Sequence, residues 1–251
     1  MLKKFAFLPL MGALLAGPAL AQEASLDAVL KGYYEAVGGI DAWKAVNTVK
    51  ATGTRQLGPG MEAPFVMLAM RPNRIRVEFT LQGMTGIMAY NGETAWMVMP
   101  FMGKTEPEVM PDFMAKEIIN EADIDGPLIG YKEDGHQVEL LGTAETEGTQ
   151  AYKLKVTLKN GDVQYWYLDS EYYVPIKLEG TTTGPNGAEM EFEAILSDYK
   201  DVGGLMMAHS VESRQKGSPS GMVMTIESVE VNPAVEAGSF NMPKVEKPEQ
   251  K

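Results

Sequence analysis

Residues 83–103 have the sequence GMTGIMAYNGETAWMVMPFMG, in which Asn91-Gly92 separates two apolar segments. An Asn-Gly pair in this setting is a strong signal for a β-hairpin. The segments are rich in methionine, with Met84, Met88, Met97, Met99 and Met102 beside Trp96 and Phe101. Core strands generally use the stiffer Val and Ile, whereas methionine is common where a surface must fit apolar partners of variable shape. The hairpin is therefore either an ordinary core element or one wall of an adaptable lipid site.

The first 21 residues have the pattern of a secretory signal peptide. A positive start at residues 1–4 precedes an apolar run at 5–15, and Ala19-Leu20-Ala21 is a small-residue cleavage site. We expect cleavage between Ala21 and Gln22, and a single domain over 22–251. The absence of cysteine excludes a disulfide and fits export to a bacterial periplasm.

The charge balance argues against some classes of partner. Without Lys3 and Lys4, the chain has 20 basic and 34 acidic residues. Nucleic acids and anionic membrane surfaces both favour basic patches, so neither is expected as a partner. No later stretch approaches the ~20 consecutive apolar residues of a membrane helix.

From Val46 onward the apolar residues follow a period of two, which is typical of β-strands. In 74–81, for example, Ile75 and Val77 share one face, and Arg74 and Arg76 share the other. Turn and breaker residues separate about twelve such segments. The predicted strands are 47–57, 62–71, 74–81, 84–90, 94–99, 136–143, 149–158, 163–169, 173–181, 188–199, 205–215 and 221–231. Residues 107–111, bounded by two prolines, are expected to break the strand run.

Two amphipathic helices are predicted. The first begins after the N-cap Ser25 and ends at Gly38-Gly39, with one further helical turn at 41–46. The second covers 113–122 after Asp112 as a cap, and a loosely ordered segment follows at 123–134. The tail after Pro233 shows little patterning.

These elements predict a mainly β fold. Short connections favour an antiparallel sheet of about 11–12 strands wound in sequence order. Such a sheet either closes into a barrel or curls into an open half-barrel, and the two helices suit a lid over its concave apolar face.

Signals for catalysis are weak. His136 and His209 are isolated, and the sequence has no cysteine, nucleophile elbow, phosphate-binding loop or dinucleotide fingerprint. The acidic pair Asp123 and Asp125 is expected on the wet face of a strand or in a loop. We predict no enzyme activity, no metal and no cofactor, although a secreted hydrolase with a scattered site is an open alternative.

Burial itself is the strongest functional signal. Ten of the 16 methionines after residue 21 fall between Met61 and Met114, on strands flanked by the predicted helices. An apolar cavity gains ~0.8 kcal/mol per buried CH₂, so a sixteen-carbon chain contributes roughly 10 kcal/mol before entropic costs. The candidate lipid-contacting residues are Phe65, Met67, Ile75, Val77, Phe79, Met88, Trp96, Val98, Met99 and Phe101.

The same region contains a family signature. The sequence Arg71-Pro72-Asn73, followed by Asn91-Gly92-Glu93-Thr94-Ala95-Trp96 and Pro100-Phe101, resembles the LolA-type periplasmic carriers of outer-membrane lipoproteins. The tail residues Phe240 and Pro243 also fit that family's pattern. The match is specific over about 62–102, and it is weak in the second half of the chain.

The resemblance implies a curved half-barrel in which helices cover lipoprotein acyl chains. It also implies a monomer that meets donor and acceptor proteins transiently at the two membranes. Arg71 takes the place of an arginine that holds the lid shut, and strand parity points its side chain inward with Met67 and Ala69. The broader superfamily also includes carriers of other lipids and sensor domains of envelope-stress regulators, so a lipid- or misfolding-sensing module is the main alternative function.

Overall fold

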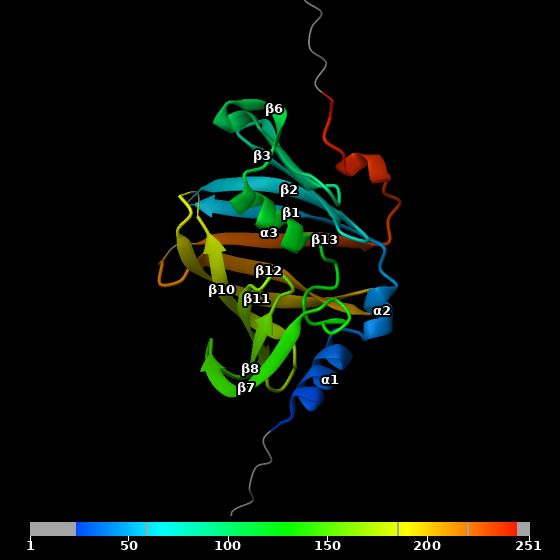
Figure 1. Cartoon of the computed structure of the whole chain (residues 1–251), viewed down its shortest axis with the longest axis vertical. Coiled ribbons are helices and arrows are strands. Elements are labelled where there is room, and N and C mark those ends of the chain that lie inside the picture. Colours follow the sequence, from blue (N-terminus) through cyan, green and yellow to red (C-terminus); the bar gives the residue numbers. More distant parts are fainter. Residues whose placement is uncertain (1–23, 59, 185, 220, 245–251) are drawn as a thin grey trace, which may run out of the picture.

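The computed structural model describes residues 24–58, 60–184, 186–219 and 221–244. The predicted signal peptide lies outside these ranges. Within them the chain forms one long antiparallel sheet with a few short helices (Figure 1). None of the described helices is long and apolar enough to cross a membrane.

Thirteen strands make up the sheet in the described ranges. They are β1 (Thr48–Gly58), β2 (Met61–Met70), β3 (Arg74–Leu81), β4 (Met84–Tyr90), β5 (Ala95–Met99), β6 (Lys104–Val109), β7 (Gln137–Thr146), β8 (Thr149–Thr157), β9 (Val163–Asp169), β10 (Pro175–Thr183), β11 (Glu189–Val202), β12 (Leu205–Gln215) and β13 (Met222–Val231). The sheet is unclosed and curved, which confirms the predicted half-barrel.

The order of the strands corrects one prediction. The sheet runs β6-β5-β4-β3-β2-β1-β13-β12-β11-β10-β9-β8-β7, so the first and last strands pair at its centre and β6 and β7 form its edges. Sequence order holds only within each half. The β1–β13 pairing shifts register between Thr52 and Gly53, where a Cβ on Gly53 would lie 2.0 Å from the Thr225 carbonyl oxygen. A glycine is therefore needed where the two halves meet.

The structure corrects a second prediction. Residues 107–111 were expected to break the run of strands, but residues 107–109 belong to strand β6. Pro107 lies inside β6, but β6 pairs only with β5. Proline lacks a backbone N–H and is tolerated on an edge strand, where only one side needs ladder hydrogen bonds.

The Asn91-Gly92 hairpin forms as predicted, with a four-residue loop. Met88 pairs with Met97, and Tyr90 with Ala95. The Asn91 side chain accepts hydrogen bonds from the backbone N–H groups of Glu93 and Thr94, at 2.9 and 2.8 Å. This local closure fixes the register of β4 and β5.

Three α-helices lie in the described ranges: α1 (Leu26–Ala36), α2 (Ile40–Lys44) and α3 (Asp112–Glu121). Ser25 caps α1, because its hydroxyl accepts a hydrogen bond from the Ala28 N–H at 3.2 Å. Asp112 was expected to cap α3, but it is the first helical residue and Pro111 occupies the cap without a side-chain hydrogen bond. Two short 3₁₀ helices, η1 (Pro100–Met102) and η2 (Ala237–Phe240), complete the elements.

The helices occupy the connections that leave the sheet. Helix α3 and the loop 122–136 join the two edge strands β6 and β7 across the concave face. In Figure 1, α3 lies in front of the sheet and α1 lies at the end that contains β7 and β8. The predicted helical cover is thus present, and its two helices lie over different ends of the sheet.

Candidate functional site

The concave face has two covered ends, each with its own hydrophobic cluster. The α1 cluster joins α1, loop residues Leu128 and Ile129, and strands β7–β9. The α3 cluster joins α3 to β3, β4 and β5. The strands β10–β13 lie between these ends, so the site can be described as two covers with a central floor.

The α1 cluster is made of branched aliphatic and aromatic side chains. Its fully buried members include Val29 of α1 and Leu154 and Val156 of β8, each with 0% exposure. Tyr34 donates a hydrogen bond from its hydroxyl to the Leu128 carbonyl at 3.1 Å. Helix α1 is therefore an integral part of the core.

The α3 cluster is rich in methionine. Met97, Met99 and Met110 are buried in it, and Met67, Met88 and Met114 pack around them. Phe79 and Phe101 meet with ring centroids 5.5 Å apart, and Gly86 leaves room for the Phe101 ring, 2.7 Å from where a Cβ would lie. From α3 itself only Ile118 is fully buried, so most of the helix surface lies outside the cluster.

Most of the predicted lipid-contacting residues share the concave face. Seven of them belong to the α3 cluster: Met67, Ile75, Val77, Phe79, Met88, Met99 and Phe101. Phe65 shares the same face, because it pairs with Phe79 on β3 and with Gly53 on β1. Whether these side chains contact lipid stays a prediction.

Trp96 and Val98 lie on the opposite, convex face. Trp96 pairs with Ala89, and Val98 pairs with Ile87, whereas the concave Met97 pairs with Met88. The prediction placed Trp96 and Val98 on the lipid-facing surface with Met99. It was wrong for these two residues, because their side chains lie on the other face of the sheet. The alternation within β5 already separates Trp96 and Val98 from Met97 and Met99.

Trp96 instead anchors the C-terminal segment. It is fully buried, and its Nε1–H donates to the Phe240 carbonyl at 2.8 Å. Arg76 lies with Cζ 5.6 Å from the Trp96 ring centroid and donates through Nη1 to the Ser239 carbonyl at 3.1 Å. The convex face of this end is therefore covered by η2, although the sequence of the tail predicted little structure.

The central floor was missed by the sequence analysis. Its side chains are only partly buried and come from strands between the two covered ends. The pairing of β1 and β10–β13 shows which side chains share the concave surface of this floor. They are Leu178, Phe192, Leu196, Val211, Met222, Met224 and Ile226. The alternation in β11 and β13 carried this signal, but the density of methionine in 61–114 drew the prediction to the first half of the chain.

A pocket of about 690 Å³ opens beside this floor. Ile119 and Asn120 of α3 line one side, and Trp166 of β9 and Leu178 of β10 line the other. A volume between 300 and 1,000 Å³ with apolar walls is typical of small-molecule sites. The loop residue Pro127 also lines this pocket.

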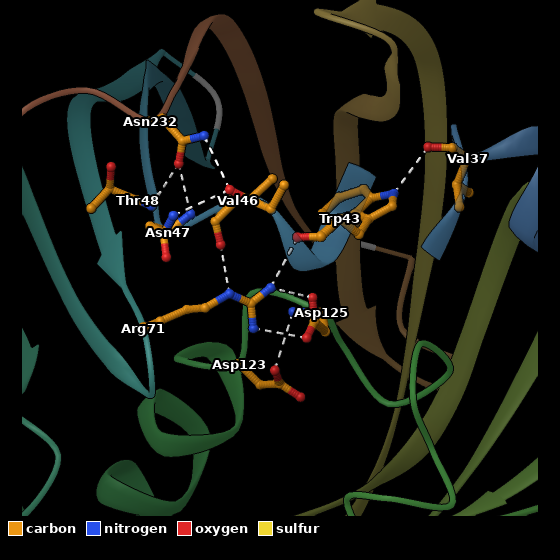
Figure 2. A network of polar contacts seen from close by, with 10 residues as sticks. Val37, Trp43, Val46, Asn47, Thr48, Arg71, Asp123, Asp125 and Asn232 are labelled. Atoms are coloured by element: carbon orange, nitrogen blue, oxygen red, sulfur yellow. Dashed lines mark hydrogen bonds and ion pairs between the residues drawn. The ribbon is translucent and has the colours of Figure 1, made fainter. Parts of the chain in front are cut away.

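Arg71, at the end of β2, joins α2 to the loop that follows α3 (Figure 2). Its Nη1 and Nη2 donate to the two carboxylate oxygens of Asp125 at 2.8 and 2.5 Å. Nη2 also donates to the Trp43 carbonyl at 3.0 Å, and Nε donates to the Val46 carbonyl at 2.5 Å. The hydrogen bond to Asp125 raises the pKa of Arg71, so the guanidinium is charged at any working pH.

The acidic pair Asp123 and Asp125 lies in the loop after α3, which agrees with one of the two expected locations, and it is part of this network. Asp125 has a side chain only 10% exposed and is the carboxylate partner of Arg71. Its backbone N–H donates to Asp123 Oδ1 at 3.1 Å (Figure 2). Burial raises the pKa of Asp123. Asn232, just after β13, accepts from the N–H of Asn47 at 2.6 Å and so ties the same corner to the end of the sheet.

Helix α3 also reaches the far wall of the concavity. Lys116 Nζ forms an ion pair with Asp162 Oδ1 at 2.8 Å in the turn between β8 and β9. Glu117 Oε1 accepts a hydrogen bond from the hydroxyl of Thr182 on β10. The cover over the floor is thus held at its far side by a few polar contacts.

The two histidines are single and separate. His136 Nδ1 accepts a hydrogen bond from the Lys159 N–H at 2.9 Å, and the buried His209 contacts the Met207 carbonyl at 2.9 Å through Nδ1. No cluster of three or more metal-ligand side chains occurs among the described residues.

The fold resembles solved structures that have little sequence in common with it. No protein-family profile and no curated protein matches this sequence. A LolA superfamily protein from Nitrosomonas europaea has a TM-score of 0.56 at 12% identity, with 87% of this chain and 98% of that chain covered. A domain named as a putative outer-membrane lipoprotein-sorting protein domain, from Vibrio parahaemolyticus, has a TM-score of 0.54 at 14% identity. The alignment covers 84% of this chain and 97% of that chain.

A DUF1329 family protein from Desulfovibrio piger is similar to the same degree, with a TM-score of 0.56 at 11% identity over 84% of this chain and 97% of that one. These likenesses cover nearly the whole of each solved chain. The half-barrel with its helical cover is therefore a LolA-like fold.

Proposed function

We propose that this protein is a periplasmic, non-enzymatic carrier that binds the acyl chains of lipoproteins, or of a related lipid, on its concave face. Cargo then moves toward the outer membrane through transient contacts with a donor and an acceptor protein, and transfer requires no bond making. The observation that carries the proposal is the partly buried apolar floor of β10–β13 under a cover that polar contacts hold in place.

The floor and its pocket support the proposal energetically. Side chains such as Phe192 and Met224 are only partly buried, so an acyl chain laid on them removes further apolar surface from water. A gain of ~0.8 kcal/mol per buried CH₂ makes such binding tight without any polar contact. The open pocket of about 690 Å³ offers a mainly apolar recess for part of the chain.

The polar contacts that hold α3 and its loop in place support the proposal that bound cargo can be released. Arg71 with Asp125, and Lys116 with Asp162, are polar contacts, so water can hydrogen-bond to the same groups when the cover opens. Opening α3 and its loop leaves the continuous sheet intact, because these segments lie between the two edge strands. Loading and unloading can therefore occur without unfolding the half-barrel.

The first test is to export the protein with its own first 21 residues in a Gram-negative host and to purify it without detergent. Mass spectrometry should then find an acylated lipoprotein or a lipid bound to it, and added acyl chains should displace an environment-sensitive dye such as N-phenylnaphthylamine. Leu178→Glu, which places a charge on the pocket wall, should weaken dye binding. Leu141→Glu, at a side chain that is 50% exposed on β7, is the matched control and should bind the dye as well as the unmodified protein does.

The carrier proposal fails if no lipid copurifies and acyl chains do not displace the dye. Recovery of one stable protein partner in place of lipid favours the sensing function instead. Displacement that is equally weak in Leu178→Glu and Leu141→Glu would move the site away from this pocket.

A further inference from the structure

Arg55 is a cation on the apolar concave face. It lies on β1, where it pairs with Ala63 of β2 and with Met224 of β13. The same face of β1 carries Gly53 and faces Phe65, whose ring centroid is 5.6 Å from Arg55 Cζ. Arg55 therefore lies directly beside the floor proposed to hold the acyl chain.

Arg55 is unlike the other four arginines of the chain. Arg71, Arg74, Arg76 and Arg214 each donate hydrogen bonds to a carbonyl or a carboxylate. In contrast, Arg55 Nε is buried and has no hydrogen-bond partner in the described part of the chain. A buried donor on a charged group is costly to leave without an acceptor, so its retention calls for an acceptor from outside the described part of the chain.

One carboxylate of α3 interacts with Arg55 at a distance. Glu121, one turn after the Thr182-bonded Glu117, interacts electrostatically with Arg55, but no ion pair within 4.0 Å joins them in the described ranges. Glu121 lines the pocket with part of its side chain exposed to solvent, and desolvation by the surrounding protein raises its pKa. The guanidinium is thus on the concave face, and no described carboxylate forms an ion pair with it.

We propose that Arg55 binds the anionic group, a carboxylate or a phosphate, of an amphiphile whose acyl chain lies along the floor of β10–β13. This inference rests on the proposed carrier function and narrows its ligand class to anionic lipids. A guanidinium donates two parallel hydrogen bonds to either group, which combines charge with direction. Because Met224 is the cross-strand neighbour of Arg55, the head group and the first part of the chain occupy adjacent places on one surface.

The test compares charged and neutral probes that have the same chains. One pair is dansylaminoundecanoic acid and its methyl ester, and the other is phosphatidylglycerol and diacylglycerol of equal chain length. The unmodified protein should bind the anionic member of at least one pair about tenfold more tightly, which corresponds to about 1.4 kcal/mol. The pair with the larger ratio identifies carboxylate or phosphate as the natural group.

The variants are Arg55→Gln, Arg55→Lys and, as control, Lys50→Gln. Lys50 lies on the same strand with its side chain paired to Glu230 at 2.6 Å, and alternation places it on the opposite face. Arg55→Gln should lose the preference for the anionic probe and keep the affinity for the neutral one. Arg55→Lys should keep most of the preference, and Lys50→Gln should keep all of it.

Thermal unfolding without ligand separates a binding role from a structural one. Because the Arg55 Nε–H is unsatisfied, Arg55→Gln should unfold at the same temperature or higher. Equal binding of acid and ester by the unmodified protein, or equal weakening of both by Arg55→Gln, overturns the assignment and leaves the carrier proposal standing. If neither member of either pair binds, both proposals fail.

Discussion

The two covered ends of the concave face solve the same packing problem with different side chains. At the α1 end, Val29, Leu30 and Tyr33 of the helix are all buried, and the cluster contains no methionine. At the α3 end, only Ile118 of the helix is fully buried, and six methionines belong to the cluster. One end is built from stiff side chains that fit in one way, and the other from flexible side chains that can repack.

The number of buried side chains on each helix indicates how easily that helix can leave the sheet. A helix with three buried anchors is costly to remove, because each anchor contributes roughly 1.5–3 kcal/mol on burial. A helix with one buried anchor and a few polar contacts can leave at much lower cost. We infer that the α1 end maintains the half-barrel and that the α3 end supplies the movable cover.

The largest effect should follow from Leu154→Ala in the α1 cluster. Leu154 has 0% exposure, and truncating a buried leucine costs about 2–5 kcal/mol when the site cannot collapse. Met99→Ala, at a residue with 4% exposure in the α3 cluster, should cost less because neighbouring methionines fill the space. Urea unfolding of both variants measures the contrast, and equal costs would remove the distinction between the two ends.

Breaking the Arg71 contacts should act mainly on the cover. Arg71→Leu removes the bidentate bond to Asp125 and two carbonyl contacts, which we expect to weaken closure by about 2 kcal/mol. Hydrogen exchange should then speed up in 112–135 about tenfold or more, with β8 unaffected. Arg74→Leu removes an arginine that lies on the other face of the sheet, and it is the control.

Cargo loading and release rates in Arg71→Leu test the role of Arg71 as a latch. We expect a folded protein that either traps cargo or fails to close. Unchanged exchange and unchanged transfer rates would leave Arg71 as a purely structural residue of the corner.

The convex face and the cover should respond to pH with opposite signs. Hydrogen bonds from Lys177 and Arg214, at 2.9 and 2.6 Å, hold the pKa of Glu193 below its ordinary 4.5. Its stabilising contribution is therefore present above pH 4.5 and is lost as the pH falls through the lower, folded-state pKa. Desolvation by the packed protein around it raises the pKa of Glu121, although part of its side chain is exposed to solvent, so its charged form opposes folding and stability falls as the pH rises above 4.5.

Thermal unfolding between pH 3 and pH 7 checks both signs. Glu193→Gln should be less stable than the unmodified protein near neutrality and should approach it in acid. Glu121→Gln should be relatively more stable near neutrality. The same pH trend in both variants would contradict the assignment of opposite effects.

The smallest effect on stability should come from the double variant that carries Met88→Val and Met99→Val. Valine keeps the apolar character at somewhat smaller volume, so the free energy of unfolding should change by about 1 kcal/mol. Its stiff rotamers should narrow the range of acyl chain lengths that displace the dye. A large loss of stability with unchanged cargo range would show that these methionines are ordinary core.

Local patterns in the sequence determined much of this architecture. Period-two alternation located twelve of the thirteen strands and predicted a concave apolar face that includes Ile75 and Val77. Turn and cap residues predicted α1 and the hairpin at Asn91, because Ser25 and Asn91 bond to backbone groups only two or three residues away. Such interactions are complete within a short segment, so the segment alone encodes them.

Only the tertiary structure decided the features that join distant segments. It paired β1 with β13, brought Asp125 to Arg71 across 54 residues, and placed Trp96 under Phe240 on the convex face. It also left the buried Nε of Arg55, beside the central floor, without a hydrogen-bond partner among the described residues. A strand's alternation fixes two faces but does not say which is concave, and a charged side chain does not encode its partner, because both depend on how the two halves of the sheet meet.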